Sequence, residues 1–197
     1  MELKDFTILK NDDCFSFIKV KDIFFHVQGG GQPHDKLLDS NGELIEIVKD
    51  EGNLLLKVKN NMIIDNKIDV FIDSDYRQLC SRLHSAGHLL SLFVFESFKL
   101  NTIKAHHFPN EGYIKVEGLI DKDKADYIES GVNAIIDKGC KVISYNKESN
   151  KRFVEFCGIG GYECGGTHVS DISEIGKFFI KNISNKKSMT TIKYDIF

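Results

Sequence analysis

Hydrophobic and polar positions alternate in short runs over the first third of the chain. Such runs predict β-strands, because successive side chains of a strand point to opposite faces of a sheet. Polar turns separate the runs, which lie at residues 15–27, 43–49, 53–59 and 68–72. Several short strands at close spacing favour a small β-barrel. We therefore predict an N-terminal β-barrel domain over residues 1–72.

The pattern changes at Asp73 and Ser74, either of which is a good residue to cap the start of a helix. Apolar residues then recur at helical spacing to about Phe98, and the second half of this segment is nearly all apolar. A helix that is apolar on most of its surface is usually buried. We therefore expect a deeply buried helix from this cap to Phe98.

Helical and strand patterns are mixed in the rest of the chain. A helix is predicted over residues 122–138, ended by Gly139. Strands are predicted at residues 112–120, 140–145, 151–156, 177–183 and 189–196. This order of elements predicts an α+β fold, in which a mixed α/β-sandwich-like domain over residues 73–197 follows the barrel.

The composition is typical of a soluble globular protein. Hydrophobic residues make up 42% of the chain and charged residues 28%. No apolar run reaches the roughly 18 residues that a transmembrane helix needs. The first residues lack the charged-then-apolar pattern of a signal peptide. We therefore expect a cytoplasmic protein with no membrane partner.

The number of cysteines is odd, and they are Cys14, Cys80, Cys140, Cys157 and Cys164. Disulfides are improbable in an intracellular chain, so we favour a metal-binding or catalytic role for one cysteine. Cys80 lies one helical turn before His84, and a buried structural role is favoured over metal binding at that position. The same interpretation is favoured for Cys157.

The net charge of −3 does not by itself indicate a nucleic-acid-binding protein. The charge is uneven, however, because residues 173–197 carry five lysines and two acidic residues. Lys181, Lys186 and Lys187 lie in this segment and are the first candidates for contacts with phosphate groups. A solvated lysine-rich surface is the alternative.

Two pairs of residues have the spacing of metal ligands. His84 and His88 lie four residues apart in the predicted buried helix, so both imidazoles occupy one helical face, one turn of about 5.4 Å apart. This spacing suits two nitrogen ligands of one Zn²⁺ ion. Taken alone, such a pair is more often two partly buried histidines with ordinary hydrogen bonds.

Cys164 and His168 repeat this spacing in a glycine-rich segment. Glycines allow the backbone to wrap closely around an ion, although a plain turn with a buried cysteine is the alternative. Two such pairs in one small chain favour zinc, because imidazole and thiolate suit zinc better than calcium or magnesium. Four protein ligands would close a tetrahedron, so a hydrolytic site needs a fifth position or one residue set back from the ion.

The residues around these pairs resemble a known family. Tyr162–Val169 is similar to the CGGTHV signature of alanyl-tRNA synthetase editing domains and of their free-standing relatives, the AlaX proteins. Phe24–Asp35 resembles the family's GGGQPxD segment, Thr102–His106 its TxGxH segment and Ser173–Gly176 its EIG turn. The matches follow the family order and span nearly the whole chain.

The resemblance implies a hydrolase of the medium-length AlaX class, with a barrel in front of the editing domain. Since no synthetase catalytic domain is present, it would edit in trans, deacylating mischarged tRNA(Ala). Ser-tRNA(Ala) is the expected substrate and Gly-tRNA(Ala) the second. The implied cofactor is Zn²⁺ at a catalytic site of His84, His88, Cys164 and His168. The partner would be the tRNA(Ala) acceptor end rather than DNA, and the three lysines named above would bind it.

The family segments also indicate residues that would contact the substrate. Thr102 matches the family threonine and would hydrogen-bond the hydroxyl of serine, which a site built for alanine rejects poorly. Gly29, Gly30, Gly31 and Gln32 would let the backbone approach the substrate, with the amide of Gln32 as a polar contact. The alternatives are that Thr102 caps a turn and that the glycines form a plain turn between strands.

Two positions depart from the family pattern. Lys104 stands where TxGxH has a glycine, which affects the expected shape of the substrate pocket. An arginine common in the family's last strand is replaced near Thr190 or Thr191, which affects a polar or tRNA contact.

Three other functions fit part of the pattern. A threonyl-tRNA-synthetase-like domain that edits Ser-tRNA(Thr) has similar ligand pairs, but it lacks the GGGQP segment and usually has proline where Thr167 stands. A non-catalytic tRNA-binding module would hold a structural zinc with closed coordination. A zinc peptidase of the HExxH type is disfavoured, because Ser85 occupies the position of the required glutamate.

Overall fold

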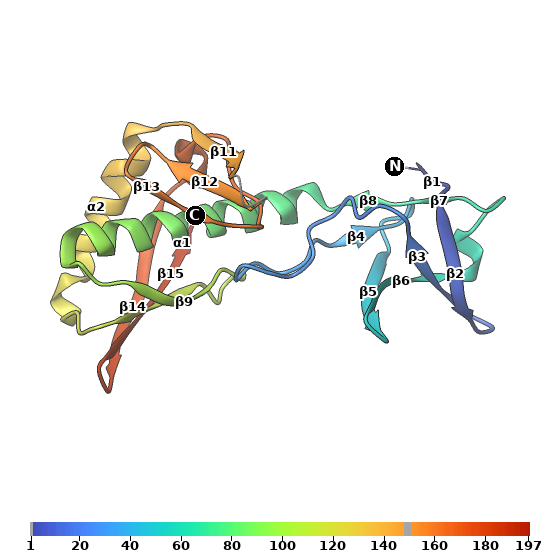
Figure 1. Ribbon diagram of the computed structural model, residues 1–197, viewed down its shortest axis with the longest axis horizontal. Helices are drawn as coiled ribbons and strands as arrows, with labels where there is room; N and C mark the ends of the chain where they lie inside the picture. Colours follow the sequence, from blue (N-terminus) through green and yellow to red (C-terminus); the bar gives the residue numbers. More distant parts are fainter. Residues whose placement is uncertain (1, 148–150) are drawn as a thin grey trace. The chain divides into compact units, whose positions relative to one another are not determined.

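The computed structural model describes residues 2–147 and 151–197, and the chain divides into two compact units (Figure 1). The first unit comprises Met1–Val27 and His34–Arg77, and the second comprises Gln28–Pro33 and Gln78–Phe197. The glycine-rich segment therefore groups with the second unit, although first-unit residues flank it in the sequence. The domain boundary at residue 72 stays a prediction.

The first unit consists of antiparallel strands. One sheet has the order β2-β3-β6-β5-β4-β8, and β1 pairs with β7. Its elements are β1 (Glu2–Leu3), β2 (Phe6–Asn11), β3 (Phe15–Val20), β4 (Leu37–Leu38), β5 (Leu44–Asp50), β6 (Asn53–Lys59), the 3-10 helix η1 (Asn60–Met62), β7 (Ile68–Asp69) and β8 (Phe71–Ile72). Over residues 2–147 and 151–197 no pairing joins the edge strands β2 and β8, so the predicted barrel is not confirmed.

Alternating burial explains where these strands form. Ile18 and Val20 of β3 are buried, as are Leu56 and Val58 of β6, and these residues form one hydrophobic cluster. The strand predicted at residues 15–27 ends at Val20, because two charged residues follow and interrupt the alternation. Strand β2 was not predicted from the sequence, since five of its six residues are exposed and leave no alternating pattern.

Over its described residues, the second unit combines two sheets with two α-helices, as expected for an α+β fold. The sheets have the orders β14-β15-β10-β9 and β11-β12-β13, and all their pairings are antiparallel. Its elements are α1 (Ser74–Phe98), which begins in the first unit, β9 (Thr102–His106), β10 (Tyr113–Glu117), η2 (Lys122–Lys124), α2 (Ala125–Lys138), β11 (Val142–Asn146), β12 (Arg152–Phe156), β13 (Gly160–Glu163), η3 (Ile172–Ile175), β14 (Phe178–Lys186) and β15 (Met189–Ile196).

The core of the second unit lies between α1 and the four-stranded sheet. Figure 1 shows α1 running across β14 and β15, and Leu83 and Leu90 of α1 share a hydrophobic cluster with Ile114 of β10 and Ile192 of β15. These four side chains have no exposed surface, so the helix is as deeply buried as its apolar pattern predicts. Among the described residues, no helix is both long and apolar enough to cross a membrane.

Both predicted helices are confirmed, with local differences at their starts. The side chain of Asp73 accepts a hydrogen bond from the backbone N–H of Tyr76 at 2.9 Å, which caps α1 as expected. The helix predicted from residue 122 starts as the 3-10 turn η2 and becomes α-helical at Ala125. Gly139 ends it with φ of +65°, a conformation that glycine adopts without strain.

The prediction that disulfides are improbable is wrong for one pair of cysteines. Cys140 and Cys157 are disulfide-bonded, with Cα atoms 5.5 Å apart. The pairing of β11 with β12 places Val142 opposite Phe156, so the two cysteines meet just beyond the paired ends. The two cysteines are 17 residues apart in the sequence, so their proximity cannot be predicted without the strand pairing. The interpretation of Cys157 as an unbonded buried thiol is therefore corrected.

Candidate metal centre

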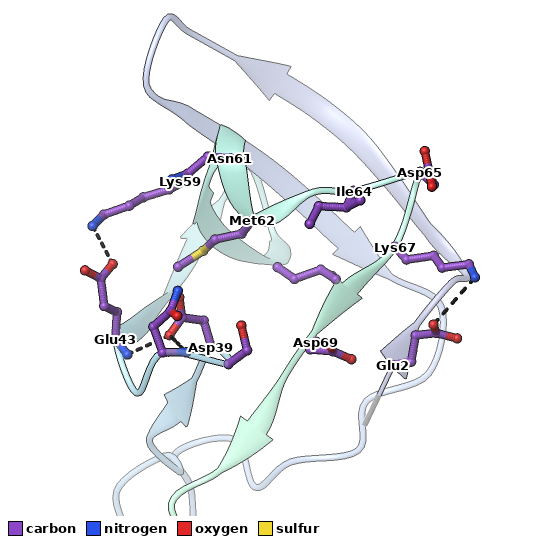
Figure 2. A pocket seen from close by; sticks show the side chains of 13 residues that line it. Glu2, Asp39, Glu43, Lys59, Asn61, Met62, Ile64, Asp65, Lys67 and Asp69 are labelled. Carbon is purple, nitrogen blue, oxygen red and sulfur yellow. Dashed lines mark hydrogen bonds and ion pairs between the residues drawn. The ribbon is translucent and has the colours of Figure 1, made fainter.

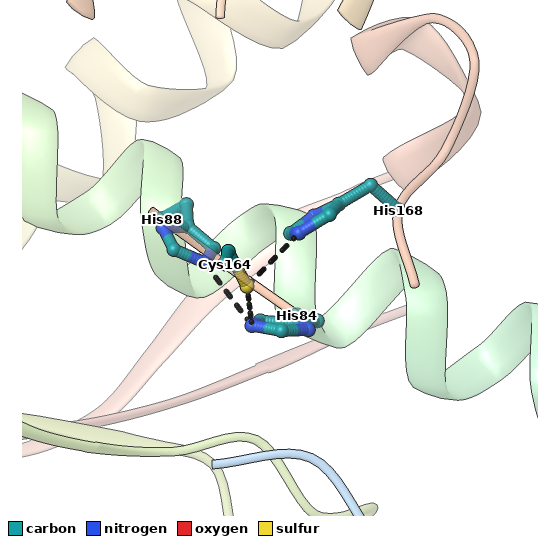
Figure 3. Close-up of side chains that lie close together, drawn as sticks. All are labelled: His84, His88, Cys164 and His168. Atoms are coloured by element: carbon teal, nitrogen blue, oxygen red, sulfur yellow. Dashed lines mark hydrogen bonds between the residues drawn. The ribbon is translucent and has the colours of Figure 1, made fainter. Parts of the chain in front are cut away.

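Two segments bring the four predicted ligands together. His84 and His88 lie one turn apart on α1, and Cys164 and His168 lie in the loop between β13 and η3. Figure 3 shows the four side chains pointing toward one another, and their ligand atoms all lie within 4.8 Å of each other. Residues separated by about 80 positions in the sequence therefore form one cluster of three imidazoles and a thiol.

The separations within the cluster are short. Nε2 of His84 lies 3.1 Å from Nε2 of His88 and 3.4 Å from Sγ of Cys164. Nε2 of His168 lies 3.4 Å from the same sulfur. His84 and Cys164 are buried, and the other two histidines are half-buried. Each imidazole thus directs a ring nitrogen at one small volume.

Neighbouring polar groups determine how two of the imidazoles are oriented. Nδ1 of His84 lies 2.7 Å from Oε1 of Gln32, which can only accept a hydrogen bond. The proton of His84 is therefore on Nδ1, and Nε2 presents its lone pair to the cluster. Nδ1 of His168 similarly lies 3.2 Å from Oγ of Ser85.

Gln32 also joins the glycine-rich segment to the loop that carries the cysteine. Its side chain has no exposed surface. Oε1 accepts from the backbone N–H of Thr167 at 2.8 Å, and Nε2 donates to Oγ1 of Thr167 at 2.8 Å. The amide of Gln32 is therefore held by protein groups on both sides. Its role as a direct substrate contact stays a prediction.

The glycine-rich segment forms a tight turn beside the cluster. Gly29 and Gln32 exchange two backbone hydrogen bonds of 3.1 and 3.0 Å, and the carbonyl of Gly31 accepts from the N–H of His107 at 2.8 Å. Gly30 has φ of +60°, and a Cβ there would lie 3.7 Å from Sγ of Cys164. The backbone at Gly30 thus faces the cluster directly, in a conformation that side chains rarely adopt.

The CGGTH loop approaches α1 so closely that its second glycine is required. A Cβ on Gly166 would lie 2.1 Å from Cε1 of His84, well inside contact distance. The guanidinium of Arg152 in β12 donates to the carbonyls of Cys164 and Gly166 and so fixes the loop from the other side. Glycine at position 166 therefore allows the thiol and the helix histidines to meet.

Burial shifts the pKa of two members of the cluster, His88 and Cys164. It lowers the pKa of His88 to about 4, so this imidazole is neutral at neutral pH. Burial raises the pKa of the Cys164 thiol, although the N–H of Gly166 and the charge of Arg152 oppose the rise. A neutral imidazole is the form that binds a metal ion, whereas the thiol must lose its proton to do so.

His107 is a neighbour of the cluster that the sequence patterns did not reveal. Its ring stacks on His84 with centroids 4.7 Å apart, and its Nδ1 lies 2.6 Å from the hydroxyl of Tyr194. Burial and the nearby His88 and His106 lower the pKa of His107 to about 3. His107 belongs to no spaced pair of ligands, so only the fold identifies it.

A pocket of about 250 Å³ adjoins the cluster. It is lined by Gly30, Gly87, His88, Ser91, Thr102, Ile103, Lys104, Ala105, His107, Tyr162, Glu163 and Cys164. Oγ1 of Thr102 is buried and has no hydrogen-bond partner among the described residues. A buried hydroxyl without a partner costs free energy, so this atom is suited to a polar group that enters the pocket.

Another pocket, of about 490 Å³, lies in the first unit (Figure 2). Its charged residues are largely paired with one another: Lys59 bonds Glu43, and Nζ of Lys67 lies 3.5 Å from a carboxylate oxygen of Glu2. None of the predicted site residues lines this pocket. The chemistry-bearing groups gather instead in the second unit.

The remaining predicted residues differ in their surroundings. Lys181 forms an ion pair with Asp195 and donates to the carbonyl of Asn110 at 3.1 Å. Lys186 and Lys187 are exposed at the turn between β14 and β15. Cys80 is buried and is not among the residues of the metal-ligand cluster. The assignment of the three lysines to tRNA binding stays a prediction.

Comparison with known proteins identifies relatives of this chain. Residues 148–191 match the family described as the threonyl and alanyl tRNA synthetase second additional domain. The chain is 30% identical over 159 residues to the alanyl-tRNA editing protein AlaX-M of Pyrococcus horikoshii, a match that covers 77% of this chain and 73% of that protein. It is 24% identical to AlaX-L of the same organism, over 77% of this chain.

Longer proteins share the same region. An alanine–tRNA ligase of Caldicellulosiruptor saccharolyticus is 27% identical over 213 residues, which cover 88% of this chain. The chain spans 24% of the length of that ligase and 44% of the length of AlaX-L. The similarity to the ligase therefore concerns one part of a larger protein.

Proposed function

Because this chain belongs to the AlaX family of alanyl-tRNA editing proteins, we propose that it hydrolyses the ester bond of wrongly charged tRNA(Ala), acting in trans. Ser-tRNA(Ala) is the main substrate and Gly-tRNA(Ala) the second. The observation that carries this proposal is the cluster of three imidazoles and a thiol beside a pocket with an unpartnered hydroxyl. An ester needs less activation than an amide, so one electrophilic centre and a water molecule suffice.

We further propose that His84, His88, Cys164 and His168 bind a Zn²⁺ ion. Zinc bond lengths of about 2.1 Å to nitrogen and 2.3 Å to sulfur place neighbouring tetrahedral ligands roughly 3.3–3.6 Å apart. The two nitrogen-to-sulfur separations of 3.4 Å fall within that range, and the separation of 3.1 Å between the ring nitrogens of His84 and His88 is slightly shorter. Bound zinc would act as a Lewis acid toward the ester carbonyl or a water molecule, which would need a fifth coordination position beside the four protein ligands.

Other residues of the chain orient these groups. Gln32 and Ser85 hold Nδ1 of His84 and His168, so that Nε2 of each ring faces the cluster. The N–H groups of Gly30 and Gly31 belong to a turn whose backbone faces Cys164, and they would stabilise negative charge on the ester oxygen. The glycine-rich segment therefore supports the site through its backbone.

Selection of serine rests on Thr102. A binding site for alanine also admits serine and glycine. Serine differs from alanine by one added hydroxyl and glycine by one missing methyl group, and such small differences change the binding free energy too little for strong discrimination. A second site that offers a hydrogen bond to the serine hydroxyl corrects the error. Thr102 lines the pocket, and its buried Oγ1 has no hydrogen-bond partner in the described part of the chain, which supports its assignment to this task. Ala-tRNA(Ala) makes no such bond. Gly-tRNA(Ala) lacks the hydroxyl too, so its slower hydrolysis does not depend on Thr102.

Deacylation assays test the proposed function. Zinc-loaded protein is expected to release serine from Ser-tRNA(Ala), release glycine more slowly and leave Ala-tRNA(Ala) intact. His88→Ala and Cys164→Ala are expected to abolish both hydrolysis and the content of about one zinc per chain. Cys80→Ser is the matched control, since this thiol is buried outside the metal-ligand cluster.

Three outcomes would contradict parts of the proposal. Hydrolysis of Ser-tRNA(Thr) in preference to Ser-tRNA(Ala) would indicate editing of the threonyl type. Binding of tRNA without hydrolysis of any ester would indicate a non-catalytic module. Absence of zinc from protein never exposed to a chelator would rule out the metal site while leaving the hydrolase to be explained by other groups.

A further inference from the structure

One face of the four-stranded sheet β14-β15-β10-β9 is open. Ile114 and Val116 of β10 and Ile192 of β15 are buried on the face that meets the core. Side chains alternate along a strand, so the intervening residues point the other way. Those residues include Tyr113 and Lys115 of β10, and neither they nor their cross-strand partners are buried.

Lysines lie next to one another on this open face. The strand register places Lys115 directly opposite Lys104 of the edge strand β9. Lys193 of β15 lies opposite Tyr113, and Lys186 lies further out near the turn of β14 and β15. Like charges directly opposite in a sheet are destabilising. No ion pair within the described residues involves any of these four lysines, so the repulsion between Lys104 and Lys115 is not offset there.

Aromatic rings lie beside these lysines on the same face. His106 of β9 is the register partner of Tyr113, and their rings are stacked with centroids 5.4 Å apart. Phe108 stacks on His106 at 4.0 Å. All three side chains are half-buried, and the carboxylate of Glu111 lies 3.5 Å from Nε2 of His106. The face therefore combines a stack of three rings with several lysines, and the carboxylates of Glu111 and Glu117 lie beside them.

A surface that combines lysines with accessible aromatic rings is suited to binding single-stranded nucleic acid. The lysines attract phosphates, and the rings stack on bases that a duplex would keep paired. We propose that this open face binds the single-stranded 3′ end of the tRNA, a step that rests on the function proposed above. The lysine surface named here is Lys104, Lys115 and Lys193, and the aromatic stack is His106, Phe108 and Tyr113.

The position of Lys104 connects this face with the pocket. Strand β9 is the edge of the sheet, and its residues Thr102 and Lys104 line the pocket beside the metal-ligand cluster. Lys104 also points to the open face, as its pairing with Lys115 requires. An RNA strand on the open face can therefore pass over the edge strand and direct its terminal ester into the pocket.

Binding of uncharged RNA to the full-length protein tests this inference. The probe is a single-stranded RNA with the acceptor-end sequence of tRNA(Ala), compared with the same sequence in a blunt duplex. Tyr113→Ala is expected to weaken binding of the single strand about tenfold, because a base loses its stacking partner. Tyr113→Phe keeps the aromatic ring and is expected to bind the single strand with wild-type affinity.

Charge reversal supplies the second measurement. Lys115→Glu with Lys193→Glu is expected to weaken binding of the single strand about tenfold and to reduce the salt slope of log Kd by about 1.4 units, about 0.7 for each lost phosphate contact. The matched control reverses Lys122 and Lys138, which are exposed on η2 and α2, and is expected to change Kd less than twofold. With aminoacyl-tRNA as substrate, the open-face variant is expected to raise KM by a similar factor.

The outcomes separate this inference from the proposed function. Equal affinity for single strand and duplex, or wild-type Kd in both Tyr113→Ala and the open-face charge reversal, would overturn the inference even if the protein deacylates Ser-tRNA(Ala). Conversely, strong binding of the single strand through this face by a protein that hydrolyses no ester would contradict the proposed function alone.

Discussion

At the scale of single residues, the proposed metal site depends on hydrogen bonds from residues other than the four candidate ligands. The side-chain amide of Gln32 forms hydrogen bonds with His84 and Thr167, and the hydroxyl of Ser85 forms one with His168. Such hydrogen bonds fix the tautomer and orientation of a ligand and so raise its affinity for the ion. The hydroxyl of Thr102 is the opposite case, because it has no hydrogen-bond partner among the described residues and is proposed to bond the substrate.

Removing the orienting amide should therefore weaken metal binding. We expect Gln32→Ala to lower zinc affinity about 10–100-fold, because His84 loses the acceptor that holds its Nδ1 proton. Competition with a chelator of known affinity measures the change. Gln78→Ala is the matched control on an exposed position of α1. A wild-type zinc affinity in Gln32→Ala would show that this hydrogen bond does not orient a ligand.

Thr102 should show opposite effects on stability and on selectivity. Thr102→Val removes a buried hydroxyl without a hydrogen-bond partner, so the free energy of unfolding is expected to rise by about 1 kcal/mol. Hydrolysis of Ser-tRNA(Ala) is expected to fall about tenfold relative to Gly-tRNA(Ala), since serine alone uses the hydroxyl. Urea unfolding and paired deacylation assays measure these quantities. Thr102→Ser keeps the hydroxyl, and an equal loss of selectivity there would contradict the assigned contact.

At the scale of elements, strand pairing joins groups that the sequence separates. Strands β11 and β12 bring Cys140 to Cys157, and the loop after β13 places Cys164 against α1. The disulfide closes a short loop and lies outside the metal-ligand cluster. Its contribution should therefore be to the stability of the second unit rather than to metal binding.

Loss of the disulfide should lower the free energy of unfolding without reducing zinc binding at the proposed metal site. We expect Cys140→Ser with Cys157→Ser to lower the free energy of unfolding by about 3 kcal/mol, the loop-closure value for a loop of roughly 15 residues. Zinc content should remain about one per chain. Urea unfolding with metal analysis measures both quantities. An unchanged midpoint under oxidising conditions would show that the bond adds no stability to the native protein.

At the scale of the whole molecule, a chain of net charge −3 would need local basic surfaces to bind the proposed tRNA substrate. The C-terminal lysines divide into two groups. Lys181 is held by Asp195, whereas Lys186 and Lys187 are exposed at the β14–β15 turn. We therefore expect the long-range attraction of tRNA phosphates to come from lysines that have no ion-pair partner among the described residues.

Reversing the charges of Lys186 and Lys187 tests whether the lysines at this turn contribute to tRNA binding. Lys186→Glu with Lys187→Glu is expected to raise KM for Ser-tRNA(Ala) several-fold and to flatten its dependence on salt, because fewer counterions are released. The ratio of serine to glycine release should hold, since the turn is not part of the pocket lining. Steady-state deacylation at several salt concentrations measures both. A KM and salt slope equal to wild type would mean that this turn is only a solvated surface.

Much of this molecule follows from local patterns in the sequence. The apolar repeat after Asp73 determined α1, and Gly139 determined the end of α2, because helical periodicity and capping act over a few residues. The spacing of His84 with His88, and of Cys164 with His168, determined the candidate ligands, since each pair lies on a single element or loop.

Only the tertiary structure decided which distant groups meet. The predicted barrel is not confirmed, and the exposed edge strands β2 and β9 carry too little alternation to be predicted. The positions of Gln32 and His107 beside His84, the disulfide, and the alignment of Lys104 with Lys115 all depend on long-range packing and strand register. A register shift by one residue would turn each strand over, so local sequence cannot specify such contacts.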